Sequence, residues 1–301
     1  MAATALRDPV VDVTVGDDVP DEHVEAIRKS VATMANRQTQ TTLAGVQRDL
    51  ARQRTALRME KPLKDVVMAD DDAAEAFELS TSAEVDDASF LTPGPRPDWP
   101  PVNVTRESGV EFDAPLTVFG APYHFQWQWH NGQPPQTSIQ DRPNGQVQLF
   151  THADQDANWS DCHGGFGVSL TTNRVVQATG RSLRRTNHWF YVAGGSFGGN
   201  ATVEGGCEMT ALEGGTRLLS LAQDKRFRRR VSAGEEGRWD EPGFETGSAI
   251  EVNWIMTPGH TYTFCCGGWV FGEAHGGVGT ASIGSVSLSA QIITMNLFLT
   301  D

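Results

Sequence analysis

Polar and apolar residues alternate with a period of two over most of the chain beyond residue 102. This alternation predicts β-strands that each present one face to a core. No helical spacing interrupts the series, which predicts antiparallel pairing in a sandwich, jelly roll or barrel. Turn residues separate at least nine expected strands, at 115–120, 123–130, 146–152, 165–172, 187–194, 201–212, 249–256, 260–274 and 285–300.

The first third of the chain shows a helical spacing instead. Residues 10–15 alternate as a short strand or arm, and an apolar stripe at three- and four-residue spacing follows from residue 24. The polar segment 36–42 interrupts this stripe before it resumes. We therefore expect a helix or a helix pair to about residue 60, and the pattern does not support a long regular coiled coil. Residues 69–89, acidic and rich in small side chains, suggest a short helix within a flexible segment.

An amphipathic helix needs a partner to cover its apolar stripe, and here the partner is either the β domain or a second copy of the chain. The second alternative makes the stripe a candidate oligomerisation surface. Its residues are Val24, Ile27, Val31, Met34, Leu43, Val46, Leu50 and Leu57.

Composition places a boundary near residue 95. Only three of the 31 glycines and one of the eight tryptophans lie in the first hundred residues. Five prolines between residues 93 and 102 favour an extended, semi-rigid spacer. We predict an acidic arm and amphipathic helix over residues 1–92, a proline-rich linker over 93–102, and an antiparallel, jelly-roll-like β-sandwich over 103–301.

Charge and cysteine content narrow the class of protein. A net charge of −14 argues against a protein that coats nucleic acid, because such binding depends on neutralising phosphates. No apolar stretch approaches the roughly 18 residues of a membrane span, and residues 1–18 do not form a secretory signal. We expect cytoplasmic synthesis, with presence in a released particle as a further alternative.

The four cysteines are expected to be thiols, and Cys265 and Cys266 are expected to point to opposite faces of one strand.

The strand predicted at 123–130 carries the first candidate ligand surface. Its aromatic face is expected to be core. The opposite polar face is most simply a solvated surface, and a concave sheet would make it a platform for sugar hydroxyls or another protein. The candidate ligand-binding residues on this face are His124, Gln126, Gln128 and His130.

An acidic segment after residue 152 carries a candidate calcium site, because it places four oxygen-bearing side chains on one short loop. The spacing departs from an EF-hand at Trp159, which stands where the loop needs glycine. The alternatives are a looser calcium loop and an Asx-rich turn without an ion, so the expectation is either calcium or no cofactor at all. The candidate ligands are Asp154, Asp156, Asn158 and Asp161.

Basic residues in the predicted β domain form a second candidate ligand surface. On a regular strand Arg226, Arg228 and Arg230 share one face and would hold phosphate, sulfate or an acidic partner. Acidic residues of the same protein are equally suitable counter-ions, and the negative net charge favours this internal use.

Function is expected at the level of class. We expect a non-catalytic structural, assembly or receptor-facing subunit of a homo-oligomeric particle such as a virion or phage tail, with its own copies and other assembly proteins as partners. The alternative is a carbohydrate-binding, calcium-dependent module with a glycan partner. A hydrolase comes third, because Gly194–Gly198 matches G-x-S-x-G around Ser196 but lacks the strand-to-helix turn of that motif.

Overall fold

The computed structural model describes residues 8–72, 74, 93, 96–100, 109–132, 135–154, 158–195, 198–239, 245–246, 250–276 and 282–301. Asn158, residues 245–246 and several helix positions between residues 53 and 67 are described by their backbone alone. The predicted short helix at 69–89 lies mostly outside these residues, and so does much of the linker.

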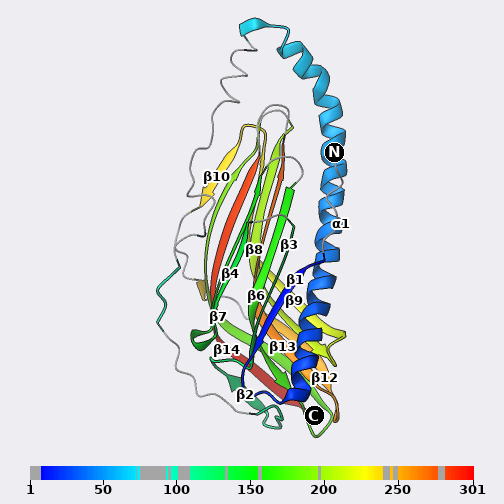
Figure 1. Ribbon diagram of the computed structural model, residues 1–301, viewed down its shortest axis with the longest axis vertical. Helices are drawn as coiled ribbons and strands as arrows, with labels where there is room; N and C mark the ends of the chain where they lie inside the picture. Colours follow the sequence, from blue (N-terminus) through cyan, green and yellow to red (C-terminus); the bar gives the residue numbers. More distant parts are fainter. Residues whose placement is uncertain are drawn as a thin grey trace.

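Two antiparallel sheets face each other, and one long helix covers the outer face of one of them (Figure 1). The six-stranded sheet runs in the order β1 (Val10–Val15), β3 (Phe125–Gly132), β6 (Asn158–Leu170), β13 (Tyr262–His275), β8 (Asn200–Glu213) and β9 (Arg217–Ser232). The eight-stranded sheet runs in the order β10 (Glu236–Trp239), β7 (Val176–Ala193), β14 (Ile283–Thr300), β5 (Gln146–Asp154) and β4 (Gln136–Asp141), with β11 (Glu245–Thr246) and β12 (Glu251–Met256) on β7 and β2 (Leu116–Phe119) on β14. The predicted fold class, mainly β with an N-terminal helix, is confirmed.

Eight of these strands interleave between the sheets as in a jelly roll. Counted in chain order from β5, leaving aside β10 and β11, they are β5, β6, β7, β8, β9, β12, β13 and β14. The eight-stranded sheet then contains the first, eighth, third and sixth, and the six-stranded sheet the second, seventh, fourth and fifth. The strands of both sheets turn an apolar face toward the opposite sheet, so the main core lies between the sheets. It includes Leu149, Phe166, Cys266 and Leu288.

The helix α1 (Asp21–Val67) is continuous for 47 residues, about 70 Å at 1.5 Å per residue. The acidic side chains of Asp21 and Glu22 in its first turn favour its start, because they complement the positive end of the helix dipole. Of the two alternatives, a helix or a helix pair, the structure has the single helix, which continues through residues 36–42. Among the described residues no helix combines the length and the apolar character that a membrane crossing requires.

The first half of α1 buries a second core on the outer face of the six-stranded sheet. Ile27, Val31 and Met34 contact the aromatic face of β3, formed by Phe125, Trp127 and Trp129, all fully buried. Farther along α1, Leu43, Val46 and Leu50 pack on Trp159, Trp269 and Phe271. The apolar stripe is thus covered by the β body of its own chain, the first of the two partners that the sequence left open.

Glycines in the six-stranded sheet make room for these aromatic rings. A Cβ added at Gly267 would lie 2.7 Å from the Trp127 ring and would also clash with a backbone oxygen of Gly164. A Cβ at Gly167 would collide with the Phe125 ring. The enrichment of glycine and tryptophan in the same part of the chain therefore has a packing cause.

The part of the linker that the structure describes contacts the β body. Trp99 is buried, and its carbonyl oxygen accepts a hydrogen bond from Gln146 Nε2 at 3.2 Å. Arg96 binds Asp141 at 3.1 Å and Gln146 Oε1 at 2.7 Å. Together with the pairing of β1 to β3, these contacts place residues from both sides of the composition boundary on one body.

Replacing Gly267 with alanine should destabilise the fold by about 1–3 kcal/mol, because the Trp127 ring and the Gly164 backbone must move apart. Gly45→Ala is the matched control. A Cβ there meets nothing within 4 Å, and alanine favours a helix interior by about 1 kcal/mol, so this variant should be at least as stable as the wild type. Urea unfolding of the two variants checks this; equal midpoints would contradict the packing argument.

Candidate functional site

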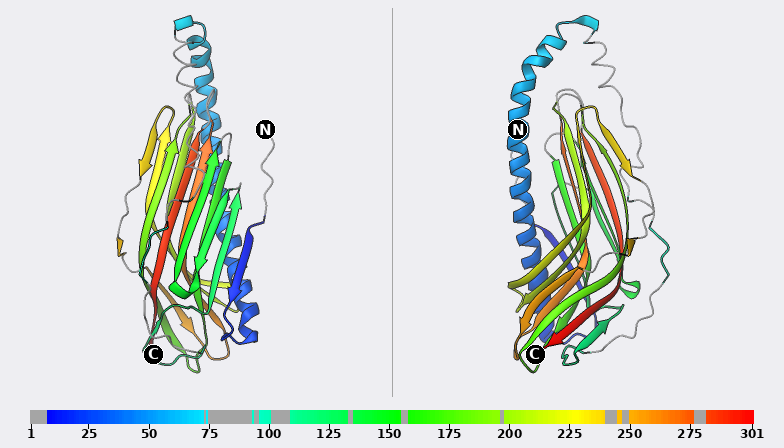
Figure 2. Two further views of the ribbon diagram at one scale, coloured as in Figure 1. Left: turned by 60° about the vertical axis from the view of Figure 1, so that its left-hand side comes forward. Right: turned by 180° about the vertical axis from the view of Figure 1, so that it is seen from behind.

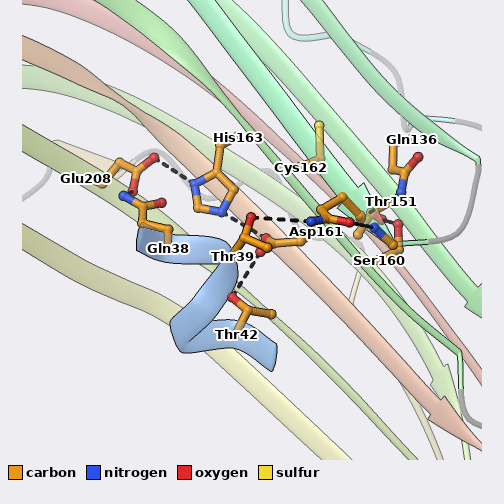
Figure 3. Close-up of polar contacts among 12 residues, drawn as sticks. Gln38, Thr39, Thr42, Gln136, Thr151, Ser160, Asp161, Cys162, His163 and Glu208 are labelled. Carbon is orange, nitrogen blue, oxygen red and sulfur yellow. Dashed lines mark hydrogen bonds and ion pairs between the residues drawn. The ribbon is translucent and has the colours of Figure 1, made fainter. Parts of the chain in front are cut away.

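A cluster of polar side chains lies buried between α1 and the six-stranded sheet, at the segment that interrupts the apolar stripe of the helix. Strand alternation in β6 turns Cys162 toward the main core and Asp161 and His163 toward the helix. Glu208 of β8 reaches the same space, and α1 contributes Gln38 and Thr42 (Figure 3). We call these five residues, Gln38, Thr42, Asp161, His163 and Glu208, the His163 cluster.

His163 is held by a carboxylate on each ring nitrogen. Its Nδ1 lies 2.8 Å from Glu208 Oε1, and its Nε2 lies 2.9 Å from Asp161 Oδ1. The ring stacks on Trp129 with centroids 3.7 Å apart. Burial by itself would lower the pKa of His163, but attraction to Glu208 and Asp161 outweighs burial and raises this pKa to about 9. The ring is therefore a buried imidazolium that donates to both acids.

The remaining carboxylate oxygens bind α1 and β9. Gln38 Nε2 donates to Glu208 Oε2 at 2.9 Å, and Gln223 Nε2 donates to the same atom at 3.1 Å. Thr42 Oγ1 donates to Asp161 Oδ2 at 3.1 Å. Every carboxylate oxygen of the cluster has a partner, so the cluster fixes the helix on the sheet.

This arrangement limits the chemistry that His163 can perform. A ring with both nitrogens protonated has no lone pair with which to accept a proton, so it cannot act as a general base while the cluster is intact. Among the described residues no three His, Cys, Asp or Glu side chains are placed to hold a metal ion. The geometry suits a structural role, in which the buried ion pairs hold α1 on the sheet. We therefore also call the His163 cluster the latch.

A groove of about 630 Å³ opens beside the latch, between α1 and β9. Gln38, Asp161 and His163 of the latch line it at one side. Gly45, Lys225, Arg228, Trp269 and Phe271 are among its other walls. The groove is the candidate ligand site of the described structure.

The predicted His/Gln face of β3 is not one open surface. The strand begins at Phe125, so His124 lies before it, buried, with its Nδ1 accepting the backbone N–H of Ser169 at 3.0 Å. Gln126, Gln128 and His130 are half-buried on the side of β3 that faces the eight-stranded sheet. Gln128 binds Asp12 of β1 at 3.2 Å, and burial lowers the pKa of His130.

The prediction that three arginines share one face is wrong. The register of β8 and β9 shifts between Gly205 and Gly206, which leaves Arg226 as an extra residue in β9. Arg226 pairs with Asp224 at 3.0 Å, whereas Arg228 lies 3.5 Å from Glu204 and Arg230 stands opposite Thr202. The two ion pairs use acids of the same chain.

The calcium prediction cannot be followed through all four ligands, because Asp156 and the Asn158 side chain lie outside the described residues. Asp154 ends β5, with His152 Nε2 at 3.6 Å. Asp161 is the fourth residue of β6, and both of its carboxylate oxygens belong to the His163 cluster. Calcium binding stays a prediction.

Two further expectations concern the cysteines and Ser196. All four cysteines are free and buried, and Cys265 and Cys266 belong to the helix-side and the main core respectively, as predicted. Ser196 of the G-x-S-x-G match lies outside the described residues.

Comparison with known proteins adds no family. No protein-family model matches the sequence, and no curated protein matches it. An arabinose-bound α-L-arabinofuranosidase is 13% identical over 61% of this chain and 22% of its own, with a TM-score of 0.13. A xylohexaose-bound endo-1,4-β-D-xylanase of Clostridium thermocellum is 10% identical over 51% of this chain and 25% of its own, with a TM-score of 0.12. The chain spans about a quarter or less of either protein, and likenesses this weak carry no argument about function.

The latch predicts a pH-dependent stability. The pKa of His163 is about 9 in the folded chain, against about 6.5 for a histidine in an unfolded chain. A raised folded-state pKa stabilises the fold fully below about pH 6.5, and this stabilisation is lost as the pH rises through about 9. At about 1.4 kcal/mol per pKa unit, urea unfolding should show a loss of up to about 3 kcal/mol over this interval.

His163→Gln should flatten this pH dependence, whatever its effect on stability at one pH. His130→Gln is the control, because the pKa of His130 is lowered and its titration falls below the interval. A wild-type urea midpoint that stays constant from about pH 6.5 to about pH 9 would show that His163 is not held as an imidazolium.

Proposed function

We propose that this chain is a non-catalytic assembly subunit that forms a homo-oligomer through the C-terminal end of α1, residues 51–67. The stripe first considered for this role, Val24 to Leu50, is occupied by the sheet of its own chain. Leu57, the last residue of that stripe, falls in the C-terminal end, and its side chain lies outside the described residues. Residues 51–67 are therefore the part of α1 that remains for a partner.

The observation that carries this proposal is the exposure of the side chains described in residues 51–67 of α1. The end of the helix extends past the ends of the strands (Figure 2). Val66 is 70% exposed, and Met68 just beyond the helix is 39% exposed. All side chains described between residues 51 and 66 are exposed, namely Ala51, Arg52, Thr55, Arg58, Pro62, Asp65 and Val66.

A helical segment of about 20 residues is only marginally stable in water by itself, so a projecting helix end gains from a packing partner. The sequence spacing of Ala56, Met59, Leu63 and Val66 is three, four and three residues, the spacing of a helix-pairing seam. A second copy brings the same seam, which suits the self-complementary interface of a symmetric oligomer.

The charges of this segment do not choose the partner. Residues 51–67 contain five basic and two acidic side chains, although the whole chain has a net charge of −14. These charged residues lie outside the four seam positions, so two paired copies keep them on the flanks of the seam, where salt screens their repulsion. The jelly-roll topology occurs in capsid and lectin domains alike, which is consistent with a particle subunit but names no activity. Presence in a released particle, with other assembly proteins, belongs to the proposal.

Sedimentation velocity of the full chain at tens of micromolar should show a multimer. Val66→Glu combined with Met68→Glu should shift it toward monomer, because charges would enter the proposed seam. Val175→Glu is the control, since Val175 is an equally bare apolar side chain, 63% exposed, in a turn of the β body.

A wild-type chain that sediments as a monomer would overturn the proposal. So would a multimer that the Val66/Met68 variant leaves intact, because the association would then use another surface. Dissociation by Val175→Glu alone would move the interface to the β body.

A further inference from the structure

The groove between α1 and β9 has the size of a ligand site. Its volume of about 630 Å³ lies within the usual range for small-molecule pockets. One wall is helix, with Gly45 leaving space where other residues would place a side chain. The opposite wall is the outer face of β9 and β13, which combines charged groups with the rings of Trp269 and Phe271.

The cations of the groove are already engaged within the chain. Arg52 lies 3.3 Å from Asp49, and Arg48 Nε donates to the carbonyl oxygen of Ala44 at 3.0 Å. On the opposite wall, Lys225 lies 2.5 Å and Arg228 3.5 Å from Glu204. An anionic ligand would have to compete with these acids, so the groove favours a neutral ligand.

Two buried polar atoms of the lining residues lack a hydrogen-bond partner among the described residues. They are Gln38 Oε1, an acceptor, and Trp269 Nε1, a donor. Both side chains are more than nine-tenths buried, at 8% and 7% exposure. A buried polar atom without a partner is costly, and a hydroxyl group can satisfy either atom because it both donates and accepts.

The cover over Trp269 can move. Lys225 Nζ lies over its ring at 5.8 Å from the centroid, and the Lys225 side chain is 44% exposed. A flexible lysine can swing into solvent and admit a ligand to the indole. The rings of Trp269 and Phe271 would then offer an apolar surface beside groups that bind hydroxyls.

We propose that this groove binds a neutral saccharide. Sugar rings present C–H faces to aromatic surface and hydroxyls to amide, hydroxyl and indole N–H groups, which is the combination of the groove walls. The site differs from the predicted His/Gln face of β3 and does not depend on whether the chain forms oligomers.

Saturation-transfer NMR on the full-length protein tests the proposal. The probes are glucose, galactose, mannose, N-acetylglucosamine and disaccharides of each. We expect transfer to at least one of these saccharides, and titration of the strongest binder then gives its dissociation constant.

Two substitutions locate the binding. Trp269→Phe removes the indole N–H and should weaken binding about three- to tenfold, the usual effect of one hydrogen bond. Trp254→Phe is the matched control, because Trp254 is equally buried with an unpartnered Nε1 but belongs to the main core. Gly45→Leu fills the groove and should abolish binding, while its thermal midpoint stays equal to or above the wild-type value because leucine favours the helix.

Several outcomes would overturn the proposal. One is the absence of transfer to every saccharide at millimolar concentration. A second is binding that survives both Gly45→Leu and Trp269→Phe, which would place the ligand elsewhere. A third is binding of inorganic phosphate or sulfate alone, which would make the groove an anion site.

Discussion

The covering of the outer face of the six-stranded sheet is the constraint on which the rest of the structure depends. β6 and β13 are buried on both faces, with the main core on one side and α1 on the other. A sheet with the rings of Phe125, Trp127 and Trp129 on its second face would otherwise expose a large apolar patch. The helix is therefore part of the body of the protein, although its amino-acid composition differs sharply from that of the β domain.

The contact between helix and sheet is apolar, then polar, then apolar along α1. Ile27 to Ala35 pack on one aromatic group, the His163 cluster follows, and Leu43 to Leu50 pack on another. A buried ion cluster adds little net stability, because desolvation offsets most of the attraction. Its effect is on register: a helix shifted by one turn would leave Asp161 and Glu208 buried without Thr42 and Gln38.

The strands and the place of the helix could be predicted from the sequence. The partners of the buried polar residues could not, for physical reasons. Alternation predicted the strands, and the polar segment 36–42 marked the place of the latch, although it was interpreted only as an interruption of the apolar stripe. Gln38 and Glu208 are 170 residues apart, so no local pattern could pair them. β9 was absent from the expected strands because its basic stretch hides the alternation, and the register shift at Arg226 changes which side chains share a face.

The calcium prediction shows the same limit for residues that are close together in the sequence. Four acidic or amide residues at short spacing suggested one loop, but Asp161 already belongs to strand β6, where neighbouring side chains point to opposite faces. Its carboxylate turns toward α1 and holds His163. Spacing along the chain therefore indicates a ligand set only where the backbone is known to be a loop.

Gln38 and Thr42 of the latch, one wall of the groove and the projecting end of α1 all belong to one continuous helix. A shift of α1 at Gln38 is carried along the continuous helix as far as Pro62, which removes one intrahelical hydrogen bond. Any ligand that occupies the groove contacts the same helix segment that the latch holds. If saccharide binding and assembly both favour the latched position, each must strengthen the other by the same free energy, because coupling between two sites is reciprocal. The ionic latch, rather than either surface alone, would then set how strongly the two events are linked.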